Sequence, residues 1–382
     1  MGDGVSAGAH PLTTDPQKEQ LEDALALCLS GGGYRAMLFH LGTLWYLNDA
    51  GYLPKLDRVS SVSGGSITAG ILGLHWSRLK FDAAGKATKF NLVIDSVRTL
   101  AHNTIDASGV IRGILTPFTT VGDRIIASYK KLVFGDATLQ SLPDKPLFVI
   151  NATNVQTGSL FRFSKPYLGD WRIGMIDRPA TTLAQAVAAS SAFPPILSPA
   201  RLTFQHNQWH SLNPGHCGKV PFTTNVVLTD GGVYDNMGLE NPWKRCKKVL
   251  VSDGGGKYQP EADPHSDWPR HALRINATID NQVRSLRKRQ IVSAFLDQND
   301  EHSGAYWGMW TTPSDYPVTS KLPIPADRGL DLARTPTRLA AMPPALQNRI
   351  INFGYGMAER AIRSYYDKTA FAPDSFPCAG GV

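Results

Sequence analysis

The stretch that decides the fold is residues 26–73, ALCLSGGGYRAMLFHLGTLWYLNDAGYLPKLDRVSSVSGGSITAGILG. An apolar run over residues 24–29 predicts a buried strand, and the three glycines at 31–33 predict a loop directly after it. Apolar residues then recur at helical spacing over residues 34–50, and Gly51 stands where a helix C-cap belongs. A strand, a glycine loop and a helix in this order form a βα unit, from which parallel sheets are built.

A second strand–helix unit follows directly in the chain. Residues 58–62 predict a strand and residues 66–76 predict the helix after it, with Ser63 on the turn between them. Because parallel strands bring their carboxyl ends to one edge of a sheet, Ser63 and the glycines at 31–33 are expected at the same edge. Open α/β folds place their ligand or catalytic sites there.

The rest of the chain continues this alternation of strands and helices. Further strands are predicted at 146–155, 225–229 and 248–252, a loop at 203–222, and helices at 123–134, at 182–192, beyond 268, and at 344–366 with an interruption at 354–356. The pattern predicts an α/β fold, in which a mainly parallel central sheet carries helices on both faces in a three-layer α/β/α arrangement. The predicted parts of the chain are a polar N-terminal arm at 1–22, a single domain at 23–370 that is helical from about 268, and a tail at 371–382.

Composition and hydropathy point to a globular protein without membrane spans. The chain has 382 residues, 42% of them hydrophobic, and its four cysteines are far apart with no C-x-x-C pair, which indicates reduced thiols. The N-terminus shows no secretory signal. The longest uncharged runs, 59–76 and 180–200, are interrupted by Ser with Gly or Pro and predict no membrane span. We therefore expect a cytoplasmic protein that meets membranes only peripherally.

Ser63 is the first candidate for chemistry. The sequence Ser61-Val62-Ser63-Gly64-Gly65 resembles the nucleophile elbow G-x-S-x-G, with Ser61 in place of the first glycine. An elbow holds its serine in a strained turn and needs small neighbours, which Ser61, Gly64 and Gly65 provide. The glycines at 31–33 add backbone N–H groups that can stabilise a developing oxyanion. Together these features indicate a serine acyl hydrolase.

The same glycines allow a second interpretation, a dinucleotide-binding loop. Gly31-x-Gly33-x-x-Ala36 fits the relaxed pattern G-x-G-x-x-A after a strand. That site expects an acidic residue at the end of the second strand, where this chain has Ser61-Val62-Ser63. A phosphate-binding P-loop is excluded because no G-K-[ST] follows the glycines. The sequence favours the hydrolase.

Two aspartates could serve as the base that a nucleophilic serine needs. Asp230 in VVLTDGGVYDN and Asp253 in VLVSDGGG each end an apolar strand and precede two glycines. Asp-Gly also forms ordinary turns, so neither context is decisive alone. His265 and His271 follow both acids, and the order Ser63, Asp230, His271 would match a Ser-Asp-His triad. The triad is the alternative mechanism.

These residues resemble the patatin-like phospholipases, in their bacterial type. That family combines a G-G-G-x-R loop, an elbow serine, an Ala/Ser-rich helix ending in Pro-Pro, and an Asp-Gly-Gly whose aspartate partners the serine without a histidine. The corresponding stretches here are Gly31–Arg35, Ser63, Ala188–Pro195 and Asp230–Gly232. The resemblance covers about residues 24–366, and the central strand Asn151-Ala152-Thr153-Asn154 also fits it.

The resemblance implies a role for each residue of the site. Ser63 is the expected nucleophile and Asp230 the general base of a Ser-Asp dyad. The oxyanion donors are expected at Gly31, Gly32 and Gly33, with supporting roles for Arg35, Gly65, Gly231 and Gly232. The implied activity is a phospholipase A or lysophospholipase that cleaves ester bonds of membrane phospholipids, with no cofactor and no metal. Other expectations remain open beside it: a triad esterase acting on other substrates, and a non-catalytic nucleotide-binding protein.

Expected partners follow from local features. From residue 244 to 290 the chain has 11 Lys/Arg against 5 Asp/Glu. The basic segment 270–289 could contact anionic lipid or bind a cyclic oligonucleotide. Some bacterial patatin-like immune effectors are switched on by cyclic oligonucleotides, and this resemblance would place the protein in antiviral defence. No nucleic-acid polymer is expected, and the oligomeric state is left open.

Two further features of the sequence are weaker evidence for a binding site. The aromatic pair Trp307 and Trp310 could form an acyl or interfacial surface, and a histidine cluster with no ordinary zinc spacing comprises His206, His210, His216 and Cys217.

Overall fold

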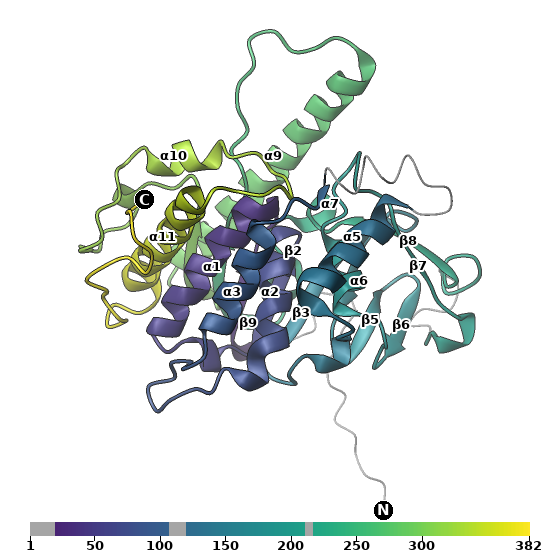
Figure 1. Cartoon of the computed structure of the whole chain (residues 1–382), viewed down its shortest axis with the longest axis horizontal. Coiled ribbons are helices and arrows are strands. Elements are labelled where there is room, and N and C mark those ends of the chain that lie inside the picture. Colours follow the sequence, from purple (N-terminus) through teal and green to yellow (C-terminus); the bar gives the residue numbers. More distant parts are fainter. Residues whose placement is uncertain (1–19, 107–119, 211–216) are drawn as a thin grey trace, which may run out of the picture.

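A computed structural model describes residues 20–106, 120–210 and 217–382. Within these residues ten strands form one sheet (Figure 1). The main path through the sheet runs β10-β9-β1-β2-β3-β4-β5-β6, while β8 pairs with β3 and β7 pairs with β8. The strands are β1 Glu22–Leu29, β2 Arg58–Val62, β3 Leu147–Asn154, β4 Ser159–Phe163, β5 Tyr167–Asp170, β6 Gly174–Asp177, β7 Ala200–Thr203, β8 Asn225–Asp230, β9 Cys246–Asp253 and β10 Ser303–Gly308.

The sheet has a parallel half and an antiparallel extension. All neighbours along β10-β9-β1-β2-β3 are parallel, and the pairs formed by β4 to β8 are antiparallel. The predicted α/β class with its central, mainly parallel sheet is confirmed. The strands β4 to β7 were not predicted, because each is only four or five residues long and too short to show a period.

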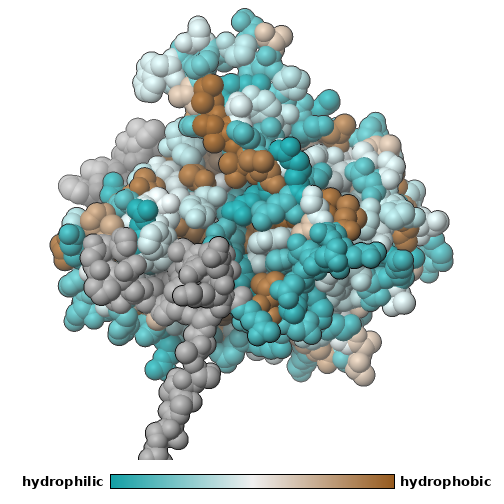
Figure 2. All heavy atoms as spheres, turned by 180° about the vertical axis from the view of Figure 1, so that it is seen from behind, coloured by the Kyte–Doolittle hydropathy of each residue, from teal (hydrophilic) through white to brown (hydrophobic). Residues whose placement is uncertain are grey.

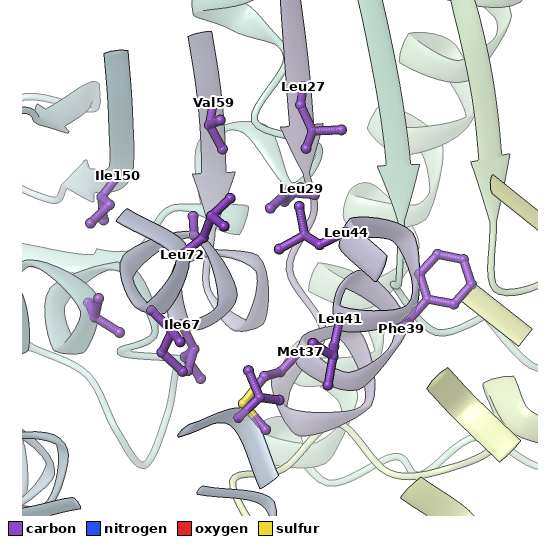
Figure 3. Packing of buried hydrophobic residues seen from close by; sticks show 14 of the residues in the cluster. Leu27, Leu29, Met37, Phe39, Leu41, Leu44, Val59, Ile67, Leu72 and Ile150 are labelled. Carbon is purple, nitrogen blue, oxygen red and sulfur yellow. The ribbon is translucent and has the colours of Figure 1, made fainter. Parts of the chain in front are cut away.

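Side chains of β1 alternate between two hydrophobic cores, one on each face of the sheet. Leu25, Leu27 and Leu29 belong to the larger core, which includes residues of α1, α2 and α11 (Figure 3). Ala26 and Cys28 belong to a smaller core on the opposite face, which α9 completes. This alternation is the period of two that a strand buried on both faces requires. The three-layer α/β/α arrangement follows from it.

The helices that cover the two faces come from the whole length of the chain. Their bounds are α1 Gly33–Asp49, α2 Gly64–His75, α3 Asn91–Ala101, α5 Val121–Tyr129, α6 Leu183–Ser190, α7 Gly232–Asp235, α8 Glu240–Trp243, α9 Trp268–Leu296, α10 Arg328–Ala333 and α11 Pro344–Ala361.

Helix α11 is continuous, and the predicted interruption at 354–356 is wrong. The glycines serve close packing of α11 against α1 instead of a break. A Cβ at Gly354 would overlap the carbonyl oxygen of Phe39, and one at Gly42 would overlap that of Ile351. Glycine lets the two backbones approach at these points, and the helical hydrogen bonds continue through them.

Strand β10 was also not predicted, and its position corrects the interpretation of Trp307. This side chain is 0% exposed, and its Nε1–H donates to Thr43 Oγ1 at 3.0 Å. The proposed acyl or interfacial surface therefore does not include Trp307. Trp310 is half-buried, with the Lys288 ammonium 4.1 Å from its ring centroid.

Helix α9 differs from the other helices in projecting from the body of the molecule (Figure 1). Its only buried residues, Ile291 and Ala294, lie near its C-terminal end, where Ile291 packs in the smaller core. Its first half and the loop before it extend into solvent. No described helix is long and apolar enough to cross a membrane.

Candidate active site

Ser63 sits at a strained turn between β2 and α2. Its φ of 53° and ψ of −118° are unfavourable for any residue with a side chain, and it is 7% exposed. The two glycines after it are sterically required, because a Cβ at Gly64 would overlap the carbonyl oxygen of Gly33 and one at Gly65 would overlap that of Leu29. The turn thus has the geometry of a nucleophile elbow, which aims the serine hydroxyl away from the strand.

A buried group of hydroxyls supports this turn from below. The N–H of Ser63 donates to Ser190 Oγ at 3.0 Å, and the Ser190 hydroxyl donates to the carbonyl oxygen of Asn151 at 2.6 Å. Ser66 Oγ lies 2.8 Å from Ser190 Oγ and 3.0 Å from Ser61 Oγ. Sequence reasoning missed the role of Ser190 and Ser66, since only the contact across 127 residues reveals it. The serine at position 61 is accommodated as a hydrogen-bonded member of the group.

The glycine loop lies directly against the serine. A Cβ at Gly31 would lie 3.2 Å from Ser63 Cβ and would overlap Asn236 Oδ1. The Gly31 N–H is already used, since it donates to the carbonyl oxygen of Asn236 at 3.0 Å. Gly32 and Gly33 have φ angles of 141° and 62°, and their N–H groups have no acceptor among the described residues. Of the three glycines expected to supply oxyanion donors, two have N–H groups that are free to do so.

Arg35 holds this loop in place. Its buried guanidinium donates from Nε to the carbonyl oxygen of Gly254 at 3.2 Å, from Nη2 to Thr337 Oγ1 at 3.0 Å, and from Nη1 to the carbonyl oxygen of Thr335. Burial, together with the nearby Arg284, lowers the pKa of Arg35 to about 10. The side chain ties the start of α1 to the end of β9 and to the connector before α11, and in this way it supports the loop.

Asp230 reaches Ser63 through the register of three strands. Val62, the last residue of β2, pairs with Asn151 on β3, and the next residue of β3, Ala152, pairs with Asp230 at the end of antiparallel β8. The carboxyl end of β8 therefore meets the carboxyl end of β2. A Cβ at Gly231 would overlap the Asn151 carbonyl oxygen, so glycine is needed for this approach.

The Asp230 carboxyl group is buried and has few partners. It is 2% exposed, and the Gly232 N–H donates to Oδ1 at 2.7 Å. Burial raises its pKa to about 7, against the lowering effect of the Gly232 N–H and of a hydrogen bond from the Ser63 side chain. Oδ2 is buried without a well-aligned hydrogen bond among the described residues. This oxygen is available to accept a proton.

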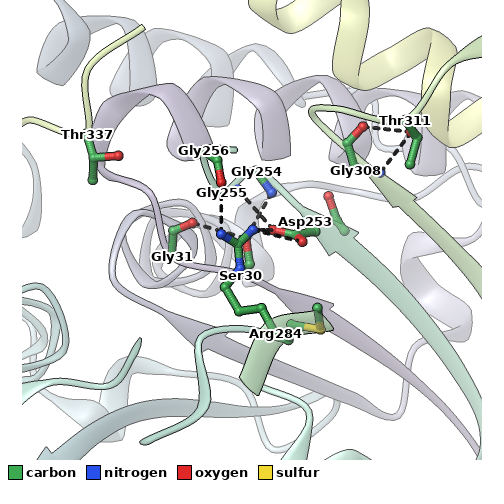
Figure 4. Close-up of polar contacts among 12 residues, drawn as sticks. Ser30, Gly31, Asp253, Gly254, Gly255, Gly256, Arg284, Gly308, Thr311 and Thr337 are labelled. Atoms are coloured by element: carbon green, nitrogen blue, oxygen red, sulfur yellow. Dashed lines mark hydrogen bonds and ion pairs between the residues drawn. The ribbon is translucent and has the colours of Figure 1, made fainter. Parts of the chain in front are cut away.

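Asp253, the other candidate base, is held in an ion pair. Arg284 Nη2 lies 3.0 Å from Oδ1 and 3.1 Å from Oδ2 (Figure 4). The Tyr306 hydroxyl and the Gly255 N–H each donate to the carboxylate at 3.0 Å. Burial raises the pKa of Asp253, but the Arg284 charge and these donors outweigh burial and lower it overall. A carboxylate bound in this way is a structural anion and a poor proton acceptor.

The described histidines give no support to a Ser-Asp-His triad. His265 and His271 are exposed near the start of α9, where His265 contacts Arg270 and His271 Nδ1 contacts the His265 carbonyl oxygen. His40 is buried between Ser252 Oγ at 2.8 Å and the Ser30 carbonyl oxygen at 2.9 Å, and burial lowers its pKa to about 4. Among the described residues, no hydrogen bond joins a histidine to Ser63 or Asp230.

The basic segment 270–289 is largely neutralised by neighbouring acids. Arg284 is paired with Asp253. Arg287 lies 2.6 Å from Glu240, Arg270 lies 2.6 Å from Asp267, and Arg274 lies 3.5 Å from Glu261. These pairs weaken the case for a ready-made polyanion site. Nucleotide binding by this segment remains a prediction.

The histidine cluster is dispersed as far as the structure describes it. His206 Nδ1 bonds to Thr223 Oγ1, and His210 lies 3.4 Å from Asp177, while His216 falls outside the described ranges. No group of three or more His, Cys, Asp or Glu side chains suited to a metal occurs within those ranges.

Comparison with known sequences decides the family. The profile of the family described as Patatin-like phospholipase matches residues 27–243. The chain belongs to this family. The match includes the glycine loop, Ser63 and Asp230, which leaves the dinucleotide interpretation without support. No curated protein sequence matches the chain.

Solved structures with a similar arrangement are distant in sequence. Human GIVD cytosolic phospholipase A2 in complex with methyl gamma-linolenyl fluorophosphonate is 16% identical, with 91% of this chain and 59% of that chain covered and a TM-score of 0.47. VipD from Legionella pneumophila is 15% identical, with 90% and 67% covered and a TM-score of 0.39. Another structure of the human enzyme covers 61% of this chain and 43% of its own, at 14% identity and a TM-score of 0.39. This chain thus spans between 43% and 67% of the length of these proteins.

Proposed function

We propose that this patatin-like protein is a lipid acyl hydrolase of the phospholipase A or lysophospholipase type, with Ser63 as nucleophile and Asp230 as general base. The observation that carries the proposal is the pairing of a strained, elbow-type serine with a buried aspartate that has no cationic partner. Membership of the patatin-like phospholipase family supports the choice of ester-linked lipids as substrates.

The first half of the proposed reaction forms an acyl-enzyme. The Ser63 hydroxyl oxygen attacks the ester carbonyl carbon while its proton passes to Oδ2 of Asp230. The carbonyl electron pair moves onto oxygen, where the N–H groups of Gly32 and Gly33 can donate to it. When the tetrahedral intermediate collapses, the bond to the leaving alcohol breaks and Asp230 returns the proton to that oxygen.

The second half releases the fatty acid. A water molecule loses a proton to Asp230 and attacks the acyl carbon, and collapse returns that proton to Ser63 Oγ as the ester bond breaks. A pKa of about 7 suits this alternation, because the carboxyl group can both accept and donate near neutral pH. An aspartate at its ordinary pKa of about 3.9 would be a far weaker base.

The test is release of fatty acid and lysolipid from defined phospholipids, identified by mass. Wild-type protein should release both products, whereas Ser63→Ala should release neither. His271→Ala is the matched control and should keep wild-type activity, because His271 is exposed and contacts only the loop before α9. Loss of activity in a folded His271→Ala variant would favour the triad instead. No release by wild type from any lipid, with or without cyclic oligonucleotides added, would overturn the proposed activity.

A further inference from the structure

Residues 268–286 of α9 present a continuous apolar face that nothing in the described structure covers. The residues concerned follow one another at intervals of three or four, which places them on one side of a helix. They are Trp268, Ala272, Ile275, Ile279, Val283 and Leu286, called here the α9 stripe. Trp268 is 82% exposed and Ile279 is 53% exposed.

The stripe lies on the part of the molecule that projects into solvent. In Figure 2 apolar side chains form a line on the projection at the top of the molecule. At 1.5 Å per residue, the turns from Trp268 to Asp280 extend about 18 Å along the helix. The buried residues of α9, Ile291 and Ala294, come after the stripe, so the helix is anchored at one end only.

The charges around the stripe favour an anionic partner. Helix α9 contains six Lys/Arg and one acidic residue, Asp280. At about 100° per residue, Arg289 flanks one side of the stripe and Arg287, which pairs with Glu240, flanks the other, each about 80° from its midline. Both flanking side chains are arginines, and no acidic residue belongs to the stripe. An anionic lipid surface complements them, and a helix with apolar and aromatic residues on one face and basic residues on the other is suited to lie in a lipid interface.

The stripe is linked to the edge of the sheet that carries Ser63. Between Val283 and Leu286 on the same helix, Arg284 binds Asp253 and the carbonyl oxygen of Gly256 at the carboxyl end of β9. Two exposed apolar residues also lie next to Asp230 or to its hydrogen-bond partner in the chain. Phe193 follows Ala192, whose carbonyl oxygen accepts the Asp230 N–H at 3.0 Å, and Val233 lies three residues after Asp230. The turn at Asp230 and the Arg284 contact of α9 thus belong to the same edge of the sheet.

We propose that the α9 stripe docks the protein on an anionic bilayer, with Trp268 and the aliphatic residues after it entering the headgroup region. Docking here brings the edge of the sheet that carries Ser63 to the lipid surface. The inference rests on the proposed lipid hydrolysis for its purpose, but the binding itself can be tested separately.

The test is co-sedimentation of the full-length chain with vesicles of phosphatidylcholine and phosphatidylglycerol, in a Ser63→Ala background so that the lipid stays intact. Ile275→Ser combined with Ile279→Ser should reduce binding at least fivefold. Leu273→Ser is the matched control, since Leu273 is 46% exposed on the same helix but lies about 120° from the midline of the stripe. It should bind within twofold of its parent.

Two further measurements separate the alternatives. With Ser63 restored, hydrolysis of a soluble short-chain ester should be the same with and without the stripe substitutions, which shows that the fold and the site are intact. Equal vesicle binding by the stripe and control variants would overturn the docking proposal. So would a change from dimer to monomer in the stripe variant without a change in vesicle binding. If the stripe variant alone loses vesicle binding while wild type cleaves no lipid, docking stands and the proposed hydrolysis fails.

Discussion

Two Asp-Gly-Gly turns with nearly the same sequence context have opposite electrostatic surroundings in this protein. Asp230 and Asp253 each end a buried strand, and each accepts a hydrogen bond from the N–H two residues later. Asp253 also has the guanidinium of Arg284 and the hydroxyl of Tyr306, and its pKa is lowered. Asp230 has no cation, and its pKa is raised to about 7. The two turns are alike, so the presence or absence of a cation beside the carboxylate distinguishes the structural acid from the candidate base.

Strand direction explains the difference. Strand β9 is parallel to β1 and ends beneath α9, where Arg284 reaches it. Strand β8 is antiparallel to β3, so its end meets the end of β2 and the turn at Ser63. The two turns therefore lie on opposite sides of β1 and the glycine loop. One becomes part of the framework, and the other becomes part of the proposed dyad.

The largest contrast between the two acids is expected in catalysis. Asp230→Asn should reduce kcat on a soluble ester at least about 1,000-fold, because removing the base of a nucleophile commonly costs that much or more. Asp253→Asn should keep kcat within about tenfold at a temperature where it remains folded. Steady-state kinetics with both variants checks this. Similar losses of kcat in both variants, with folding verified by circular dichroism, would show that Asp230 is not the base.

The next largest effect is expected in the free energy of unfolding when Asp253 is substituted. Asp253→Asn leaves the largely buried guanidinium of Arg284 without its anion, which typically costs about 3–5 kcal/mol of the free energy of unfolding. Denaturant unfolding at pH 7 measures the loss. Adding Arg284→Met to Asp253→Asn should restore part of it, because the uncompensated charge is removed. A single variant as stable as wild type would contradict the structural role of the pair.

At Asp230 an Asp→Asn substitution should instead increase the free energy of unfolding at pH 8. The folded pKa lies above the unfolded value, so the folded state holds this proton more tightly, and stability falls as pH rises from about 4 to about 7. Asp230→Asn removes that loss and should be more stable than wild type by about 2–4 kcal/mol at pH 8. The gain should shrink toward zero below pH 4. Thermal unfolding at the two pH values checks the sign, and a variant less stable at pH 8 would contradict the raised pKa.

The smallest predicted effect concerns the hydroxyls beneath the elbow. Ser190→Ala removes the acceptor of the Ser63 N–H, and an unmet buried donor costs about 1–3 kcal/mol. We expect kcat to fall about tenfold with KM nearly unchanged, because the strained turn is less well held. Ser190→Thr, which keeps the hydroxyl, should recover most of the rate. Equal kcat in Ser190→Ala and wild type would show that the turn does not depend on this bond.

The sequence identified the parts of the site that local sterics determine. Gly31 to Gly33 and the small residues around Ser63 were recognisable because close backbone approaches and a strained turn need them in adjacent positions. Fold class was recognisable from apolar runs alternating with helical periods. The choice of Asp230 over Asp253 came from the family resemblance, because the residue that neutralises Asp253 lies 31 positions away.

What the sequence could not provide are contacts between distant segments. The hydroxyl of Ser190 supports Ser63 across 127 positions, and the Gly31 N–H is occupied by Asn236, which leaves Gly32 and Gly33 as free donors. The same limit explains the error at Gly354, where glycine signals helix contact and not a helix break. The ion pairs of α9 also depend on tertiary structure. They leave fewer of its basic side chains free to bind a partner than the sequence suggests.

The most direct test of the Ser63–Asp230 assignment is the rate at which a fluorophosphonate probe labels the protein, measured by intact mass and peptide mapping from pH 5 to 9. We predict one adduct per chain, on Ser63, with a rate that rises with pH and levels off above about 7. Asp230→Asn should slow labelling at least about 1,000-fold, while folded Asp253→Asn should label near the wild-type rate. An adduct on another residue, or wild-type labelling of Asp230→Asn, would contradict the assignment.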